Sequence, residues 1–340
     1  MRDDLNEVIN NDEFQENTSG YIYSTRDNIN SPLEFIKYDI KRKTKTRLSQ
    51  NLPCVNQMYS DWDMEDNYIA CVVKEEKNLN SNITIYNLHN FSQIKQVDFI
   101  DNTYPSSIES QTYHVMFRLS PDGKQIAILQ NHSKTPNVYY NNQCFHVPDR
   151  FKLLVVDTTD GSLVFRSNNY YSGGKLAWSA NSNKLFVTTF FDSNIYNGEG
   201  SGKCINVETK GISYDSGTKF VETIFEIDLP EKKRRSIVNA KVSSLFFTKN
   251  NLFFSSWKDF YVWEVYKYDL SKEKLDHLGD IESVRLSGIS PNGKWLMGNY
   301  KTDIPVERFS LLLSADDLDD RLVYEDFLQI RTIWVENDQI

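Results

Sequence analysis

A short apolar strand, a tight polar turn and a second apolar strand recur along this chain. The clearest copy runs from Met116 to Leu129 around Ser-Pro-Asp-Gly, and the unit returns between Leu286 and Met297 around Ser-Pro-Asn-Gly. In such a turn proline presets φ at the first corner, Asp or Asn tolerates the second, and glycine accepts the left-handed exit. A hairpin that recurs in this way indicates a repeat protein made of similar β units.

Looser copies extend the repeat over most of the chain. The residues that end the first strand of each copy are Trp62, Leu119, Trp178, Phe247 and Ile289. Two further strands follow each hairpin, and the third strand tends to end in aspartate, as in Phe151–Asp157. The intervals match or exceed the ~40–45 residues of a four-stranded blade, so the longer ones carry loop insertions. The pattern predicts an all-β fold of four-stranded antiparallel blades, apolar in the inner strands and more polar outward.

The two ends of the chain complete the repeat. Gly20–Thr25 is interpreted as a second strand without a first, and Ile330–Asp338 as a first strand without a second. We therefore expect the C-terminal strand to join the N-terminal blade and close a six-bladed β-propeller, since the long loops lack the alternation of a seventh blade. Residues 19–340 then form one propeller domain. The acidic, Asn-rich residues 1–18 form a flexible N-terminal tail.

Charge and hydropathy limit the classes of partner and compartment. The 340 residues include 47 Asp and Glu against 38 Lys and Arg, a net charge of −9, which argues against a broad nucleic-acid surface. The basic run 232–235 is interpreted as an exposed hairpin turn. No apolar run approaches the ~20 residues of a membrane span. The N-terminal residues lack the features of a signal peptide, so we expect a cytoplasmic protein, or a periplasmic one if an export signal has been removed.

The four cysteines, Cys54, Cys71, Cys144 and Cys204, are too few and too scattered for a disulfide scaffold. Cys71 lies in an apolar run and is interpreted as a small buried side chain. Cys144 and Cys204 lie in two long loops. They are either two reduced thiols or one disulfide, and the disulfide needs an oxidising compartment.

The repeat resembles that of TolB-like propellers, also found in the propeller domains of prolyl-oligopeptidase-type enzymes. The residues that carry the resemblance are Leu-Ser-Pro-Asp-Gly-Lys-Gln-Ile-Ala-Ile at 119–128 and Leu-Leu-Val-Val-Asp-Thr-Thr-Asp-Gly at 153–161. The resemblance implies a six-bladed propeller that binds other proteins or peptides. It carries over no functional residue, because the motif residues are structural in that family.

Two long insertions mark a candidate binding surface. They span residues 132–150 in the predicted third blade and 192–219 in the fourth, and both fall on the face opposite the Ser-Pro-Asp-Gly turns. Tyrosine is favoured at binding surfaces because it offers large contact area and a polar tip at small entropy cost. The insertions either bind a partner or pack on each other and cap the channel. The residues expected to share this rim are Tyr139, Tyr140, Phe145, His146, Tyr170, Tyr171, Tyr196 and Tyr214.

The sequence shows no strong catalytic or cofactor signature. There is no Gly-x-Ser-x-Gly elbow, and Cys144-x-His146 lacks the second close pair of a zinc site. Gly198–Lys203 lacks the strand and helix that flank a phosphate-binding loop. We therefore expect neither a metal nor a cofactor.

These observations leave three functional hypotheses. The first is a non-catalytic module that binds a protein or peptide, such as an inhibitor or immunity-type protein, whose partner carries a basic patch because this chain is acidic. The second is a propeller hydrolase or lyase, which needs carboxylates, histidines or metal ligands at the channel mouth. The third is a propeller that has lost, or pairs with, a separate catalytic subunit.

Overall fold

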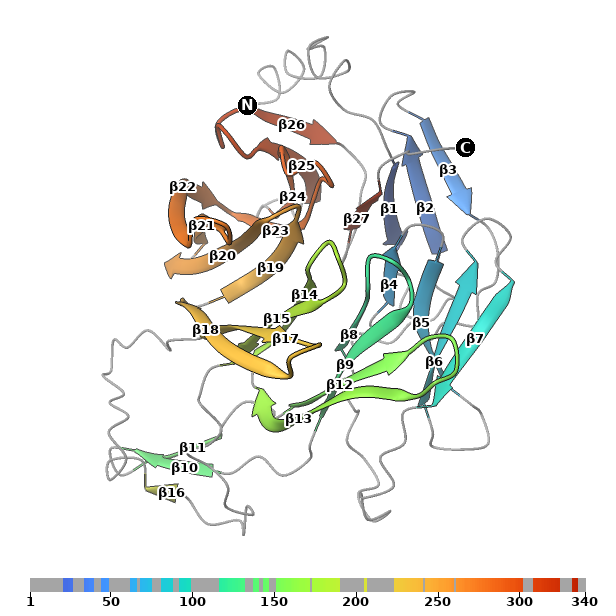
Figure 1. The fold of residues 1–340 in the computed structure, drawn as a ribbon. Coiled ribbons are helices and arrows are strands. Elements are labelled where there is room, and N and C mark those ends of the chain that lie inside the picture. Colours follow the sequence, from blue (N-terminus) through green and yellow to red (C-terminus); the bar gives the residue numbers. More distant parts are fainter. Residues whose placement is uncertain are drawn as a thin grey trace. The chain divides into compact units, whose positions relative to one another are not determined.

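The computed structural model describes residues 21–26, 34–39, 44–48, 62–65, 68–74, 81–87, 92–98, 116–131, 137–140, 143–146, 151–171, 173–189, 205–206, 223–240, 242–259, 261–301, 308–324 and 332–335. Within these ranges the chain forms strands and turns and no helix (Figure 1). Accordingly, no described helix is long and apolar enough to cross a membrane. The predicted tail, residues 1–18, lies outside the described residues.

Two compact units divide the chain, residues 1–99 with 243–340 and residues 100–242. Apart from Val242, the first unit holds four four-stranded antiparallel sheets, here called sheets I, II, V and VI. Sheet I contains β27 (Thr332–Val335), β1 (Tyr21–Arg26), β2 (Glu34–Asp39) and β3 (Thr44–Leu48), in that order. Sheet II contains β4 (Trp62–Glu65), β5 (Tyr68–Lys74), β6 (Ser81–Asn87) and β7 (Gln93–Asp98). Sheet V contains β19 (Val242–Thr248), β20 (Asn251–Asp259), β21 (Val262–Asp269) and β22 (Lys274–Glu282). Sheet VI contains β23 (Val284–Ile289), β24 (Trp295–Lys301), β25 (Arg308–Ser314) and β26 (Arg321–Tyr324).

The second unit holds sheets III and IV and a smaller insert sheet. Sheet III contains β8 (Met116–Leu119), β9 (Gln125–Asn131), β12 (Phe151–Asp157) and β13 (Leu163–Tyr171). Sheet IV contains β14 (Gly173–Trp178), β15 (Lys184–Thr189), β17 (Thr223–Asp228) and β18 (Lys233–Asn239). The insert sheet contains β11 (Gln143–His146), β10 (Asn137–Tyr140) and β16 (Ile205–Asn206). The long insertions therefore carry short strands, which the sequence analysis did not expect.

The structure confirms an all-β fold of antiparallel four-stranded blades. It also confirms that the C-terminal strand joins the N-terminal blade, because Thr332–Val335 pairs antiparallel with Tyr21–Ser24. A single closed ring of six blades in one domain stays a prediction, since each compact unit is defined by itself.

Side-chain hydrogen bonds explain why the repeated turns fold as they do. The Ser120 hydroxyl donates to Asp122 Oδ1 over 2.6 Å and accepts from the Gln125 amide over 2.9 Å. Gly123 takes the left-handed exit at φ 67°. The turn at Ser290 repeats both contacts, to Asn292 over 2.8 Å and from Trp295 over 2.9 Å. The turn chemistry expected from the sequence is confirmed in both copies.

The core of the second unit lies between sheets III and IV. Leu153, Val155 and Leu185 are fully buried there, and the outer strand β18 is mostly exposed or half-buried. The indole N–H of Trp178 in β14 donates to the carbonyl of Arg118 in β8 over 3.0 Å, which ties the inner strands of the two sheets together. Apolar inner strands and polar outer strands are the gradient that the sequence predicted.

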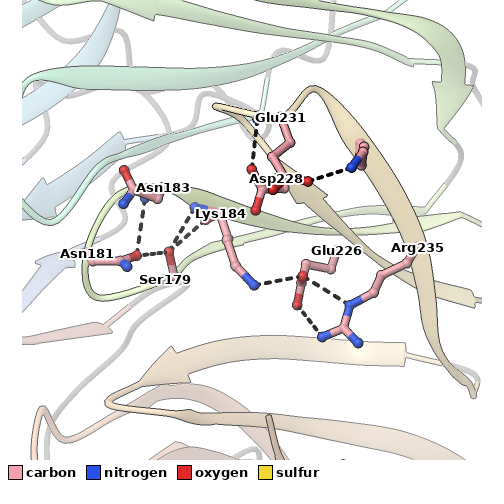
Figure 2. A network of polar contacts seen from close by, with 9 residues as sticks. Ser179, Asn181, Asn183, Lys184, Glu226, Asp228, Glu231 and Arg235 are labelled. Carbon is pink, nitrogen blue, oxygen red and sulfur yellow. Dashed lines mark hydrogen bonds and ion pairs between the residues drawn. The ribbon is translucent and has the colours of Figure 1, made fainter. Parts of the chain in front are cut away.

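A buried carboxylate holds the outer strands of sheet IV. Glu226 in β17 is 4% exposed and accepts from Lys184 in β15 over 2.9 Å and from Arg235 in β18 over 3.0 and 3.1 Å (Figure 2). Burial by itself raises the pKa of Glu226, but the hydrogen bonds and charges of Arg235 and Lys184 outweigh it and hold that pKa below the usual 4.5. The carboxylate therefore stays ionised and links three neighbouring strands.

Candidate functional site

The two long insertions meet in the insert sheet. Strand β10, from the first insertion, pairs antiparallel with β11 and parallel with β16, from the second insertion. The register places Val138 beside Ile205 and Tyr139 beside Asn206. The insertions of sheets III and IV thus lie side by side, an arrangement that both a binding surface and a cap require.

Most of the predicted rim residues are placed by their backbone alone. Tyr139 pairs with Cys144, Val138 with Phe145, and Asn137 with His146, so Tyr139, Phe145 and His146 share one hairpin with Tyr140. Tyr170 lies in β13 opposite Lys152. Tyr196 and Tyr214 lie outside the described residues. A shared contact surface for these side chains stays a prediction.

Tyr171 departs from that prediction. Its side chain is 1% exposed and belongs to the core between sheets III and IV. Its hydroxyl accepts a hydrogen bond of 3.2 Å from Ser167, which is itself buried. The pairing of β13 with β12 is irregular between Arg166 and Tyr170, and this irregularity separates the exposed start of the strand from the buried Tyr171. Tyr171 is a packing residue, which the abundance of tyrosine on this stretch did not reveal.

A pocket of about 390 Å³ opens between the outer strands of sheets III and IV. Its apolar lining residues come from β13 and β17, and its cationic ones come from β13, the β17–β18 turn and the start of β18. The lining residues are Leu163, Val164, Phe165, Arg166, Ser167, Tyr171, Ile227, Lys232, Lys233 and Arg234. Of these described side chains, four are cationic and none is acidic. The pocket therefore differs in sign from the chain as a whole.

The basic run 232–235 is more than an exposed turn. Only Lys232 lies in the turn before β18, at φ 53°. The Arg234 guanidinium stacks over the Phe225 ring, 4.3 Å from its centroid, and Arg235 pairs with the buried Glu226. Alternation along β18 places Arg234 and Arg235 on opposite faces of the sheet. Arg234 therefore both packs on Phe225 and lines the pocket, whereas Arg235 supports the buried Glu226.

Sheet V carries a polar cluster that sequence reasoning missed. Ligand atoms of the described residues Glu264, His277 and Asp280 lie within 4.8 Å of one another, a grouping that suits a cation. Lys258 Nζ lies 2.6 Å from Asp280 Oδ2, and the Tyr266 hydroxyl donates to Glu264 over 3.0 Å. Burial and the Glu264 carboxylate raise the pKa of Tyr266 to about 12. The contacts with Lys258 and Tyr266 give the two carboxylates partners within sheet V. Strand pairing brings these residues together.

Cys71 in β5 is buried and forms a disulfide. The apolar run around Cys71 predicts a small buried apolar side chain. Burial agrees with that interpretation, and the disulfide corrects it. A disulfide persists in an oxidising environment and is rare in the cytosol.

We expect that no more than two of the four cysteines react with iodoacetamide in concentrated guanidinium without reductant, because four cysteines less the bonded pair leaves two. Intact-mass spectrometry counts the added groups. After reduction all four should react. Three or four alkylated cysteines before reduction would show that Cys71 is not bonded.

No known family model matches the chain, and no curated protein matches its sequence. Solved structures do resemble its fold. TolB from Acinetobacter baumannii has a TM-score of 0.55 at 14% identity, over 93% of this chain and 66% of that chain. The tricorn protease has a TM-score of 0.52 at 11% identity, over 93% of this chain and 30% of that chain. A chain of a nidogen/laminin complex has a TM-score of 0.51 at 9% identity, over 93% of this chain and 97% of that chain.

At these identities the likeness concerns the fold alone. This chain spans about two thirds of the TolB chain and less than a third of the tricorn protease chain. The recurring Ser-Pro-Asp-Gly hairpin, the four-stranded antiparallel sheets and the structural likeness agree with one another. The chain has a TolB-like β-propeller fold.

Proposed function

We propose that this protein is a propeller that binds a protein or peptide partner without catalysing a reaction. The contact surface is the part of the second unit that carries the insert sheet. The pairing of β10 with β16 supports this proposal, since two neighbouring blades each contribute an insertion to one small sheet. Loops held on a rigid β scaffold are a common way to build a binding surface.

The structural neighbours are compatible with binding and with catalysis. A nidogen/laminin complex contains a chain of this fold, which supports a role in protein association. The tricorn protease supports the enzyme alternative, but this chain corresponds to 30% of that protein. We favour binding because the insertions of sheets III and IV are joined to each other.

The charge of the protein and its disulfide indicate the charge of the partner and the compartment. The net charge of −9 favours a partner with a basic patch at long range. Screening limits that effect to about 8–10 Å at physiological salt, so groups in contact decide which ligand fits the cationic pocket. The disulfide at Cys71 favours an oxidising compartment over the cytoplasm expected from the N-terminal sequence.

A partner isolated from the native host tests the proposal. We expect a variant with Tyr139, Tyr140 and Phe145 replaced by serine to bind the purified partner at least about tenfold more weakly, since aromatic anchors commonly contribute more than ~1 kcal/mol each. Isothermal titration calorimetry measures the affinity. Thermal melting should be unchanged, because these residues lie in the insert sheet rather than in a four-stranded blade.

Tyr261→Asn is the matched control. Tyr261 is 49% exposed, lies at φ 69° between β20 and β21, and has no place in the insert sheet. Asparagine tolerates that backbone conformation. This variant should bind the partner as the unaltered protein does. Equal affinity of the insert variant and the unaltered protein would refute the proposed contact surface, and turnover of the partner would refute a non-catalytic role.

A further inference from the structure

The pocket between β13 and β18 concentrates positive charge in an acidic protein. Arg166, Lys232, Lys233 and Arg234 line it, and no described lining side chain is acidic. Lys233 Nζ has a contact of 2.9 Å with Glu231, but both side chains are well exposed, and such pairs contribute little. We propose that this pocket binds an extended acidic peptide segment of the partner protein, an inference that rests on the proposed binding function.

The apolar part of the pocket distinguishes a peptide from a small free anion. Leu163 is 54% exposed and Val164 is 38% exposed, and both lie on β13 and line the pocket together with the cations. Exposed aliphatic side chains next to cations suit a ligand that carries apolar groups and carboxylates in turn. A free inorganic anion would use the cations and leave these side chains in water.

The position of β13 and β18 at the outer edges of their sheets also favours a peptide ligand. In the described part of the chain, β13 and β18 are the outer strands of sheets III and IV, each paired on one side. An outer strand can pair with an added strand, whose side chains then alternate between pocket and solvent. A segment with a carboxylate at every second position directs those side chains to the pocket face, where their methylene groups meet Leu163 and Val164 and their carboxylates meet the cations. The volume of about 390 Å³ is near the lower end for ligand pockets and suits a few residues.

The experiment uses fluorescence anisotropy of a labelled peptide with alternating glutamate and valine, measured against the full-length protein. The same peptide with glutamine in place of glutamate is the neutral comparison. We expect the acidic peptide to bind at least about tenfold more tightly than the neutral one, because charge-assisted hydrogen bonds are roughly twice as strong as neutral ones. Equal binding of the two peptides would overturn the proposal.

Two variants with equal loss of charge locate the site. Arg166→Gln with Lys232→Asn removes two pocket cations, and asparagine tolerates the positive φ of Lys232. Lys272→Gln with Lys274→Gln removes two exposed cations of sheet V. The first pair should weaken acidic-peptide binding at least about tenfold, and the second should leave it within twofold. Equal weakening by both pairs would overturn the proposal, since it would show a general charge effect.

Inorganic phosphate separates a peptide site from a small-anion site. We expect phosphate to displace the acidic peptide only at concentrations far above that of the peptide, because it makes no apolar contact with Leu163 and Val164. Displacement by phosphate at a concentration that carries only as much negative charge as the peptide would overturn the peptide assignment. If the partner still binds the protein while the acidic peptide does not, this inference fails and the proposed function stands. If the insert variant binds the partner normally, the proposed contact surface fails whatever the pocket binds.

Discussion

Replacing Gly298 by alanine is expected to lower the free energy of unfolding by about 2–3 kcal/mol, within the range for overpacked cores. Gly298 lies in β24, and a Cβ added to it would come 2.4 Å from Val284 Cγ1. Val284 is itself 2% exposed in β23, so it has little room to move. Urea denaturation followed by circular dichroism measures the loss.

A second substitution tests whether the steric contact is the cause. Val284→Ala removes the methyl group that the new Cβ meets, at the cost of a cavity when it is made alone. In the double variant the alanine methyl of residue 298 fills part of that cavity. The double variant should therefore be more stable than the sum of the two single losses predicts, by about 1 kcal/mol or more. Strict additivity would exclude the contact as the reason.

The repeat made much of the fold predictable. Turn residues carry local information, because Ser120 and Asp122 close their turn by hydrogen bonds within a few residues. The same chemistry returns at Ser290, so one recognised hairpin located its copies. The pairing of β27 with β1 was predictable because an unpaired strand at each end has only the other as its complement. The short strands of the insert sheet were not, because their pairing is non-local and shows no strong alternation in the sequence.

The candidate site was less predictable for physical reasons. The role of each residue in the basic run depends on strand register, which sends Arg234 toward Phe225 and Arg235 toward Glu226. Tyr171 is buried beyond an irregularity in the pairing of β13, although its tyrosine-rich sequence suggested a surface. The residues that line the pocket come from two different sheets. Arg166 and Arg234, for example, are more than sixty positions apart in the sequence. Contacts between residues so far apart in the sequence cannot be predicted from composition or from local sequence patterns.

Glu226→Gln is expected to lower the free energy of unfolding by about 2 kcal/mol at neutral pH. Breaking a fully buried ion pair costs roughly 3–5 kcal/mol, but here only the carboxylate is buried. The side chains of Lys184 and Arg235 are 36% and 45% exposed, so water compensates part of the loss. Glutamine keeps the shape and some hydrogen bonds, so the variant should fold, and denaturant unfolding reports the difference.

The pH dependence identifies the charge as the cause. Lys184 and Arg235 hold the pKa of Glu226 below the usual 4.5 although burial opposes them, so the folded state binds its proton less readily than the unfolded state. The stabilisation is then fully present above the ordinary pKa and is lost as the pH falls through the lower pKa of the folded state. The stability difference between the unaltered protein and Glu226→Gln should therefore be constant near neutrality and shrink below about pH 4.5.

Glu231→Gln is the matched control, because Glu231 also pairs with a lysine in the same β17–β18 hairpin. Its contact with Lys233 is 2.9 Å, the same as that of Lys184 with Glu226, but the Glu231 side chain is 59% exposed and that of Glu226 is 5% exposed. The control should therefore change the stability by less than about 0.5 kcal/mol. Equal losses from the two substitutions would mean that burial of the Glu226 carboxylate contributes nothing. A loss at Glu226 that persists unchanged in acid would point to packing rather than charge as the source of the stability.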